Sequence, residues 1–355
     1  MSGRSCGKAA VIGAGIVGLF TAFKLREAGF EVEIYEKSVP GSGASTKNAN
    51  VIHLIQPPPG KLRRVLALRG ARLHRVYSSI LGYRILDVPL ILAATGLQES
   101  LILKMLKPLV EKVYGVKAYI VSGDRARDLE PALSDNVVSA MVIEGYGIVD
   151  SKEVISRLVK SLLENSVHII NVEAKALKAG PNIITSEGEI KGYNIVINAA
   201  GEDASRLART LGDIIPTIKV PGLMTLHSKP RLRSIVARPP AGIKLESKGG
   251  GVIPQLDGKT LLGPTFGLRG SRGVSELRRI FNKLLSEDVG EPLKVVEGVR
   301  VIAVRGRDFK IRRSYREPHI IHLVGIESPG FTAAPSIAEL VLEMAGCKKE
   351  GFNPP

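Results

Sequence analysis

Three segments with different hydrophobic patterns open the chain. Lys8–Gly13 is a short apolar run, as in a buried parallel strand. Ile16–Ala28 repeats apolar residues at helical spacing and is followed by Gly29, a residue that commonly ends helices. Glu31–Glu36 then alternates polar and apolar residues. This pattern predicts a strand, a helix and a second strand, which together form a βαβ unit.

The remaining chain mixes two kinds of pattern. We expect helices at 61–81, 99–114, 151–163, 274–287 and 334–345, the third opened by a capping box that starts at Asp150. We expect strands at 84–94, 118–121, 167–172, 183–186, 194–198, 252–256, 259–262 and 320–325. Asp257-Gly258 is a good hairpin turn between two of these strands.

The order of these elements predicts two interleaved domains. Pieces typical of βαβ units lie at the start, near 150–216 and at the end, whereas antiparallel-type strands occupy the intervals. We therefore expect an α/β protein, α+β overall, in which a Rossmann-like domain is interleaved with a domain built on a mainly antiparallel sheet. The Rossmann-like, cofactor-binding domain would comprise 1–85, 149–216 and 297–355, and the substrate-binding domain 86–148 and 217–296.

Length and composition narrow the class of protein. The 355 residues are 44% hydrophobic, yet no run approaches the ~18–20 apolar residues that span a bilayer. The polar start at Met1–Lys8 does not resemble a signal peptide, so we expect a cytoplasmic protein, with peripheral contact at the inner face of the membrane left open. Cys6 and Cys347 stand far apart and outside any CxxC pair. We expect neither a zinc site, nor an iron–sulfur cluster, nor a disulfide framework.

The net charge of +16 is unevenly placed. Residues 37–86 contain nine Lys or Arg and no acidic residue, and a second basic cluster runs from Arg300 to Arg316. Such clusters suit an anionic substrate, a nucleic-acid or membrane surface, or simply a solvated exterior. Abundant charge with only three glutamines also favours a thermophilic source.

The segment Gly13-Ala-Gly15-Ile-Val-Gly18 follows the first strand and opens the first helix. In this context the first glycine permits a tight turn, the second lets the backbone approach a pyrophosphate, and the third allows close helix–strand packing. Glu36 ends the next strand, 18 residues after Gly18, where a carboxylate can accept hydrogen bonds from a ribose. The motif predicts a dinucleotide site but does not distinguish FAD from NAD.

Three further segments resemble the D-amino-acid oxidase superfamily of flavoenzymes. Gly43-Ala-Ser-Thr-Lys-Asn-Ala-Asn-Val-Ile-His53 is similar to its second loop, Ile197-Asn-Ala-Ala-Gly201 to a later strand end, and Gly325–Pro335 to its C-terminal flavin-binding turn and helix. The resemblance implies FAD. Because neither cysteine lies in a flavin-contact motif, we expect the cofactor to be bound without a covalent bond, with attachment through His53 as the alternative, and the spacing of the cysteines and histidines predicts no metal. Motif and resemblance together imply FAD contacts from Gly13, Ala14, Gly15, Ile16, Val17, Gly18, Glu36, Lys37, Ala44, Ser45, Thr46, Asn48, Ala49, Asn50, Val172, Ala199, Ala200, Gly201, Gly330, Phe331 and Thr332.

Within this superfamily the chain is most similar to the branch of anaerobic-type glycerol-3-phosphate dehydrogenases and L-2-hydroxyglutarate dehydrogenases. Asn-Val-Ile-His, Gly147-Ile-Val-Asp150 and the Gly-Ile-Glu-Ser-Pro-Gly turn carry that resemblance. Two features depart from the branch. Its frequent cysteine-bearing extension does not follow the last helix, and its Gly-Leu-Arg-Pro is replaced by Gly298-Val-Arg300-Val.

Two residues are candidates for the chemistry. In the family the arginine at the position of Arg300 faces the flavin from the substrate side, and a guanidinium binds carboxylate or phosphate with two parallel hydrogen bonds. His53 is a candidate base for a hydroxyl proton, although a histidine packed beside the flavin would fit the same pattern. His227 is a reserve base.

The resemblance predicts an FAD-dependent dehydrogenase that moves a hydride from a small anionic substrate to flavin N5. Glycerol 3-phosphate is the first candidate, and an L-2-hydroxy acid or an amino acid such as proline or glycine is the alternative. A flavoprotein acting on tRNA and an electron-transfer subunit of a larger complex are further alternatives. We do not expect nucleic acid as the partner, and the electron acceptor is left open.

Overall fold

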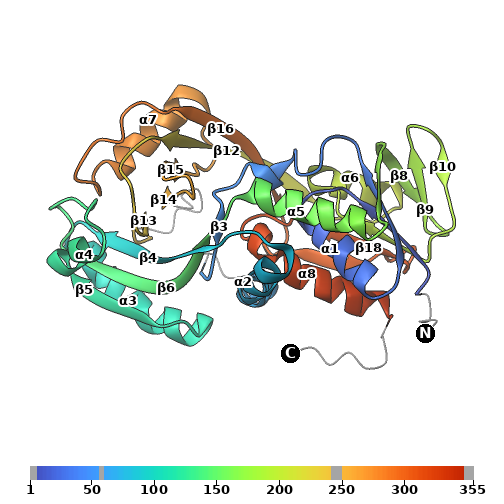
Figure 1. Ribbon diagram of the computed structural model, residues 1–355, viewed down its shortest axis with the longest axis horizontal. Helices are drawn as coiled ribbons and strands as arrows, with labels where there is room; N and C mark the ends of the chain where they lie inside the picture. The colour runs from blue at the N-terminus through green and yellow to red at the C-terminus, as the bar shows by residue number, and fades with distance from the viewer. Residues whose placement is uncertain (1–5, 56–59, 241–249, 348–355) are drawn as a thin grey trace.

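The computed structural model describes residues 6–55, 60–240 and 250–347 (Figure 1). One part of the molecule is built on a six-stranded sheet whose central strands are parallel. Its strands, in spatial order, are β17 (Lys310–Arg313), β18 (Ile320–Val324), β11 (Ile195–Asn198), β1 (Lys8–Ile12), β2 (Glu31–Glu36) and β7 (His168–Asn171). The edge strand β17 is antiparallel to β18.

Both faces of this sheet are covered, which explains its continuous apolar strands. Side chains of β1 alternate between the two faces of the sheet: Ala9 and Val11 pack against helices on one face, and Ala10 and Ile12 lie on the other. The first face carries α1 (Ile16–Glu27), α2 (Lys61–Leu81), α5 (Ser151–Glu164) and α8 (Gly330–Ala345). The second carries α6 (Ala204–Thr210) and a small sheet of β8 (Ala174–Lys178), β9 (Asn182–Thr185) and β10 (Glu189–Ile190).

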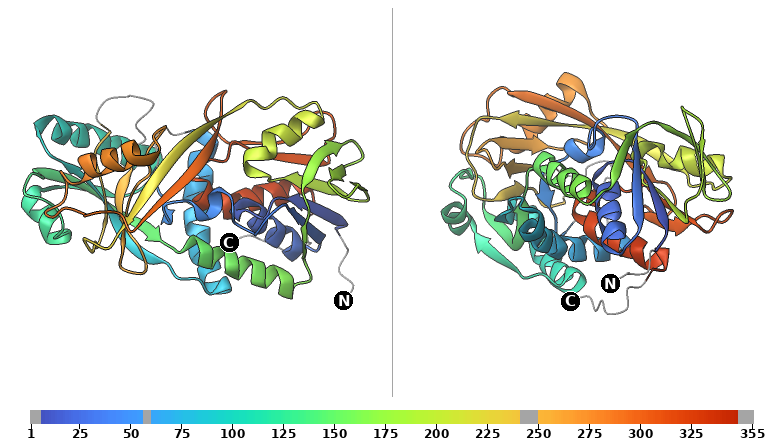
Figure 2. Two further views of the ribbon diagram at one scale, coloured as in Figure 1. Left: turned by 90° about the horizontal axis from the view of Figure 1, so that it is seen from above. Right: turned by 45° about the vertical axis from the view of Figure 1, so that its right-hand side comes forward.

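The other part of the molecule is built on a nine-stranded, mainly antiparallel sheet (Figures 1 and 2). Its strands run in the order β16 (Lys294–Ala303), β12 (Thr217–His227), β15 (Thr260–Gly263), β14 (Gly251–Pro254), β13 (Ile235–Ala237), β4 (Leu86–Ala94), β6 (Ser139–Ile148) and β3 (Val51–Ile52), and β5 (Ala118–Ser122) also pairs with β6. One face packs on α7 (Gly270–Phe281) and α4 (Gly123–Leu129), and α3 (Leu97–Tyr114) lies on the other. Short 3-10 turns η1 (Ala44–Thr46) and η2 (Gly201–Asp203) complete the described elements.

The predicted fold class is confirmed, and most predicted elements lie within a few residues of the observed ones. The Asp257-Gly258 turn connects β14 to β15 as expected. The helix predicted at 274–287 is displaced, because α7 spans Gly270–Phe281. Leu284 and Leu285 prolong the apolar pattern but reach the core from a turn, where Leu285 forms a bridge with Leu133. The short helices α4 and α6 and several strands, among them β3, β6, β8, β16 and β17, were not predicted.

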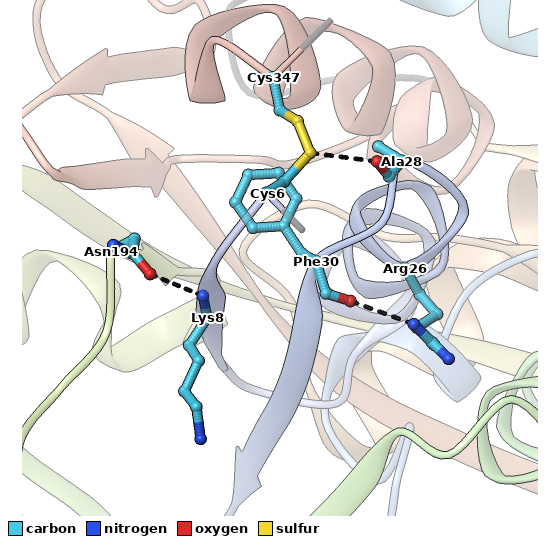
Figure 3. The surroundings of a disulfide bond; sticks show 7 residues. All are labelled: Cys6, Lys8, Arg26, Ala28, Phe30, Asn194 and Cys347. Atoms are coloured by element: carbon cyan, nitrogen blue, oxygen red, sulfur yellow. Dashed lines mark hydrogen bonds between the residues drawn. A yellow bond between two sulfur atoms is a disulfide. The ribbon is translucent and has the colours of Figure 1, made fainter. Parts of the chain in front are cut away.

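The expectation of no disulfide is wrong. Cys6 and Cys347, which are 341 residues apart in the sequence, form a disulfide bond, and their Cα atoms lie 5.9 Å apart (Figure 3). Cys6 precedes the central strand β1, and Cys347 follows α8. Because α8 packs on α1, next to β1, the fold brings the two ends together. Spacing along the sequence could not show this. Among the described helices, none is long and apolar enough to cross a membrane.

Candidate functional site

A cavity of about 1290 Å³ runs from the carboxyl ends of β1, β2 and β11 to the face of the nine-stranded sheet. The carboxyl edge of parallel strands is where α/β folds bind ligands. Most of the residues predicted for the cofactor line this cavity, namely Gly13, Gly15, Ile16, Val17, Glu36, Lys37, Ala44, Ser45, Asn48, Ala49, Ala199, Ala200, Gly201, Gly330, Phe331 and Thr332. Both predicted catalytic residues, His53 and Arg300, line it too.

The loop between β1 and α1 has the backbone of a phosphate-binding turn. Gly13 adopts φ +102°, a conformation that L side chains rarely take. A Cβ on Gly18 would lie 1.9 Å from the carbonyl oxygen of Gly13, so only glycine fits there. Ser45 Oγ accepts a hydrogen bond of 2.9 Å from the Ile16 N–H at the start of α1. No side chain caps the helix at Gly15, so the first turn presents its N–H groups and positive dipole end to the cavity.

Glu36 is fixed at the end of β2. Its carboxylate accepts hydrogen bonds from the Ala14 N–H at 2.7 Å and the Ser38 N–H at 3.0 Å. A carboxylate offers about four acceptor positions, so Glu36 can still receive the two hydroxyls of a ribose. The next residue, Lys37, is paired with Asp203 at 2.6 Å.

A buried polar network supports the end of β11. Asn198 Nδ2 donates to the Ala204 carbonyl and lies 3.1 Å from His322 Nδ1, while His322 Nε2 lies 3.1 Å from Asp213. All three side chains are buried. This network orients Ala199–Gly201, the cavity-lining residues that follow β11.

Five predicted cofactor residues do not line the cavity and instead support residues that do. Asn50 takes φ +61° and links its neighbours to the second sheet, because its Nδ2 donates to Gln255 Oε1 at 2.8 Å. Its Oδ1 accepts from the Ser151 N–H at 3.2 Å, at the start of α5. Thr46 donates to the Gly41 carbonyl, which closes the same loop. The complete set is Ala14, Gly18, Thr46, Asn50 and Val172.

The start of α8 is joined directly to His53. Thr332 Oγ1 accepts a hydrogen bond of 3.0 Å from the His53 N–H and lies 3.4 Å from the Val51 carbonyl. The N-terminal turn of α8 and the strand β3 therefore form one continuous wall of the cavity. The N-cap residue of α8 is Pro329, and no side chain caps this end of the helix. N–H groups at the start of α8 therefore also face the cavity.

A buried arginine from the first basic cluster supports the same wall. Arg63 Nη1 lies 3.1 Å from Glu327 Oε1, and the guanidinium also donates to the carbonyls of Ser328 and Arg307. Asp308 accepts hydrogen bonds from the N–H groups of Leu62 and Arg63 at the start of α2. Arg63 stands at helical spacing from the buried Leu66 and Ala67, which places it on the inner face of α2, but only the fold shows that its partner is Glu327.

His74 supports Phe331 from behind. The two rings stack with centroids 5.5 Å apart, and His74 Nε2 lies 3.0 Å from the Phe331 carbonyl. Burial lowers the pKa of His74 to about 4, so the ring is neutral at pH 7. Since a carbonyl only accepts, the proton of the neutral ring resides on Nε2. The Tyr83 hydroxyl donates to the His74 carbonyl at 2.8 Å and lies 3.0 Å from Nδ1.

His53 lies between the wall formed by α8 and the face of the nine-stranded sheet. Its ring meets Tyr146 edge-on, with centroids 6.2 Å apart, and burial lowers the pKa of His53 to about 4. The imidazole is therefore neutral at pH 7 and can accept a proton. Tyr146 itself, which hydrogen-bonds the backbone of Ile55, was not predicted.

Arg300 projects into the cavity from β16. Its Nη1 donates to the Thr265 carbonyl at 3.2 Å, and its guanidinium lies over the Phe266 ring at 5.5 Å. Burial lowers the pKa of Arg300, and the nearby charge of Glu327 opposes that shift. Starting from an ordinary pKa above 12, the side chain remains a cation at neutral pH. His227, the reserve base, is buried and hydrogen-bonded to Thr225, outside this cavity.

Comparison with known proteins agrees with this geometry. Residues 8–344 match the family model described as FAD dependent oxidoreductase (DAO). The chain is 26% identical to glycerol 3-phosphate oxidase of Mycoplasma genitalium, covering 97% of this chain and 96% of the relative, and 26% identical to glycerol 3-phosphate dehydrogenase of Caloramator mitchellensis, covering 97% and 76%. The solved structure of dithionite-reduced L-alpha-glycerophosphate oxidase from Mycoplasma pneumoniae with FAD bound superposes with a TM-score of 0.89 at 25% identity, over 98% of both chains.

The phosphate-binding turn, the strand-end carboxylate and the uncapped helix α8 suit a dinucleotide of the length of FAD, and the family match confirms FAD as the cofactor. The expected superfamily and an oxidoreductase activity are confirmed with it. By fold, site geometry and a match over nearly its whole length, this chain belongs to the family of FAD-dependent oxidoreductases.

Proposed function

We propose that this enzyme oxidises a CH–OH group of a small organic anion, with sn-glycerol 3-phosphate as the first candidate. The observation that carries the proposal is the cavity shared by Arg300 and His53. Arg300 is a partly buried cation that donates to the Thr265 carbonyl and lies over the Phe266 ring, so its charge is available to an anion. The relatives named for glycerol 3-phosphate support phosphate as that anion.

The residues divide the work between binding and proton transfer. Arg300 would hold the phosphate with charge-assisted hydrogen bonds and so orient the carbinol carbon. FAD, when bound, supplies the hydride acceptor. His53, neutral and desolvated, would take the hydroxyl proton at an imidazole nitrogen. An anion bound at Arg300 would favour the protonated imidazole that results.

The cofactor contacts are part of the same proposal. Gly13, Gly15 and Ser45 would face the pyrophosphate, Glu36 the ribose, and Gly330–Thr332 the flavin. The uncapped start of α8 would then stabilise negative charge on the reduced ring. The six-stranded sheet supports assigning most of 1–85, 149–216 and 297–355 to cofactor binding, and the nine-stranded sheet supports assigning 86–148 and 217–296 to substrate binding. The exceptions are β3 and residues 297–303 of β16, which pair within the nine-stranded sheet.

The test is the visible spectrum of the FAD-loaded protein under anaerobic conditions. Bleaching of the flavin band by sn-glycerol 3-phosphate is the expected result. Arg300 could bind a carboxylate equally well, so bleaching only by an L-2-hydroxy acid or an amino acid would replace the substrate and keep the enzyme class. A flavin that none of these compounds reduces would refute the proposal.

We also propose that α3 contacts an anionic membrane surface. Leu97, Leu101, Met105 and Leu109 recur every fourth residue and are 88%, 60%, 69% and 53% exposed. We call them the α3 stripe; the exposed lysines Lys104 and Lys112 lie on the same helix. An apolar face beside cations is typical of interfacial helices. We expect the protein to co-sediment with phosphatidylglycerol vesicles but not with phosphatidylcholine vesicles. The double substitution Leu101→Gln and Met105→Gln should weaken this co-sedimentation. Equal sedimentation of the variant would contradict this contact.

A further inference from the structure

The cavity extends well beyond the residues assigned to catalysis, and there its wall is apolar. Leu90 pairs with Ile143 and Leu92 with Met141, as alternate residue pairs between β4 and β6. All four side chains line the cavity. Residues two apart in a strand share a face, so these pairs form one continuous apolar surface.

A bulge in β6 joins this surface to the catalytic end of the cavity. The register moves from Val88–Tyr146 to Leu90–Ile143, so β6 holds one extra residue, and Gly145 takes φ +91°. Tyr146 consequently faces the same side as Ile143 and meets His53. From Tyr146 to Met141 the strand covers roughly 15 Å, which is the length of this apolar wall.

The opposite side is closed by α3, which contributes Leu106, Val110 and Val113. Leu109 also lines the cavity although it is 53% exposed, and it is the last member of the α3 stripe. Apolar side chains therefore continue from the catalytic end of the cavity to the protein surface.

The charged side chains beside this wall have partners or lie at its end. Arg238 is paired with Glu99, the acid at the start of α3. Arg64 lines the cavity from α2, close to Tyr114 at the end of α3. The wall itself consists of methyl and methylene groups. A glycerol phosphate without an apolar chain would not cover these groups and would leave them in contact with water.

We infer that the substrate is an amphiphile: an anionic head bound at Arg300, a carbinol carbon beside His53, and an apolar chain lying between the β4–β6 wall and α3. The inference rests on the proposed function and specifies its substrate class. A glycerol 3-phosphate that carries an alkyl chain on its first oxygen has all three parts, because its second carbon keeps a free hydroxyl.

Chain length is the variable that tests this. The FAD-loaded enzyme is titrated by calorimetry with sn-glycerol 3-phosphate and its 1-O-butyl, hexyl and octyl ethers, each below its micellar concentration. Burial of the chain is expected to tighten binding by about fourfold per methylene. Affinity that stays level or weakens as the chain grows would overturn the inference.

Two matched variants separate the cavity from the surface. Leu109→Lys changes a side chain that lines the cavity, whereas Leu101→Lys changes an equally exposed leucine of the same helix that does not. We expect the octyl ether to lose at least tenfold in affinity for Leu109→Lys and to bind Leu101→Lys as it binds the parent enzyme. Equal losses would mean adsorption to the α3 stripe and would refute binding inside the cavity.

Anaerobic flavin reduction distinguishes failure of this inference from failure of the proposed function. If glycerol 3-phosphate bleaches the flavin and the ethers bind no better, only the amphiphile is refuted. If the ethers bind more tightly with length but no member of the series bleaches the flavin, the apolar site stands as a binding site and the oxidation of a glycerophosphate is refuted.

Discussion

Arg63 on α2 and Glu327 in the turn before α8 form a salt bridge of 3.1 Å in which the side chains are 2% and 3% exposed. The pair joins a helix of the first face of the six-stranded sheet to the wall of the cavity, since Glu327 lines it. A buried ion pair adds little to stability when intact, but the loss of one partner leaves the other charge without compensation.

Glu327→Leu is therefore expected to lower the free energy of unfolding by about 3 kcal/mol and to weaken FAD retention. Urea unfolding followed by circular dichroism, together with the absorbance of FAD released on gel filtration, measures both. Arg125→Ala is the control, because its pair with Asp128 is exposed on both sides and is worth less than about 1 kcal/mol. Equal losses for the two variants would show that burial of the pair does not matter.

His53→Asn is expected to slow flavin reduction by about 10²- to 10⁴-fold while the protein keeps FAD, because a general base is lost. Stopped-flow reduction under anaerobic conditions gives the rate, and the flavin spectrum before mixing gives the occupancy. His319→Asn, at an exposed position, is the control. Retention of the parent rate in His53→Asn would assign proton transfer to another group.

Acid is expected to destabilise the protein through His53 and His74, whose folded-state pKa values are lowered by burial to about 4. Between pH 6.5 and 4 the unfolded chain binds these protons and the folded chain does not. Stability is therefore complete above pH 6.5 and falls as the pH is lowered towards 4, by about 1.4 kcal/mol per pH unit for each histidine. Urea unfolding from pH 7 to 4.5 measures the slope, and His74→Phe should make it shallower than in the parent. An unchanged slope would mean that His74 takes up its proton in the folded state.

Arg300→Met is expected to raise the substrate concentration for half-maximal flavin reduction by roughly 10- to 100-fold, because a charge-assisted pair of hydrogen bonds to the anion is lost. Arg305→Met, an exposed member of the same basic cluster, should leave this value unchanged. A similar shift in both variants would show that long-range charge, rather than contact at Arg300, attracts the substrate.

Gly18→Ala should abolish stable FAD binding, because the new Cβ would lie 1.9 Å from the Gly13 carbonyl oxygen and force the phosphate loop apart. Gly96→Ala is the matched control, since Gly96 lies outside the cavity and no described atom lies within 4 Å of its Cβ position. Fluorescence of FAD during titration into the stripped protein measures both affinities. Normal binding by Gly18→Ala would show that the loop adjusts.

The sequence predicted what local patterns encode. Apolar runs, helical spacing and the glycines at Gly13 and Gly18 identify the first βαβ unit, because each depends on neighbours close in sequence. The supports of the site depend on contacts across the fold, such as Arg63 with Glu327 and His74 with Phe331. Helical spacing puts Arg63 on the buried stripe of α2, but it does not show that a carboxylate from the turn before α8 meets it there.

The substrate side illustrates the same limit. Leu90, Leu92, Met141 and Ile143 are ordinary strand residues in the sequence, where alternation predicts a buried face but not what that face contacts. Only the bulge at Gly145 and the position of α3 show that this face lines the cavity. Family resemblance was enough to propose His53 and Arg300 as catalytic candidates. The apolar side of the cavity could be described only from the folded structure.

The Cys6–Cys347 bond gives the chain the connectivity of a ring. The segment from Cys6 to Cys347 is closed on itself, so a single cut at an exposed turn, such as Ser186–Gly188 between β9 and β10, would produce no separate fragment. The two pieces would migrate together in gels without reductant and separate only after the bond is reduced. A protease that opens one surface loop would thus add two chain ends at the cut and leave the cofactor-binding strands held in one covalent piece.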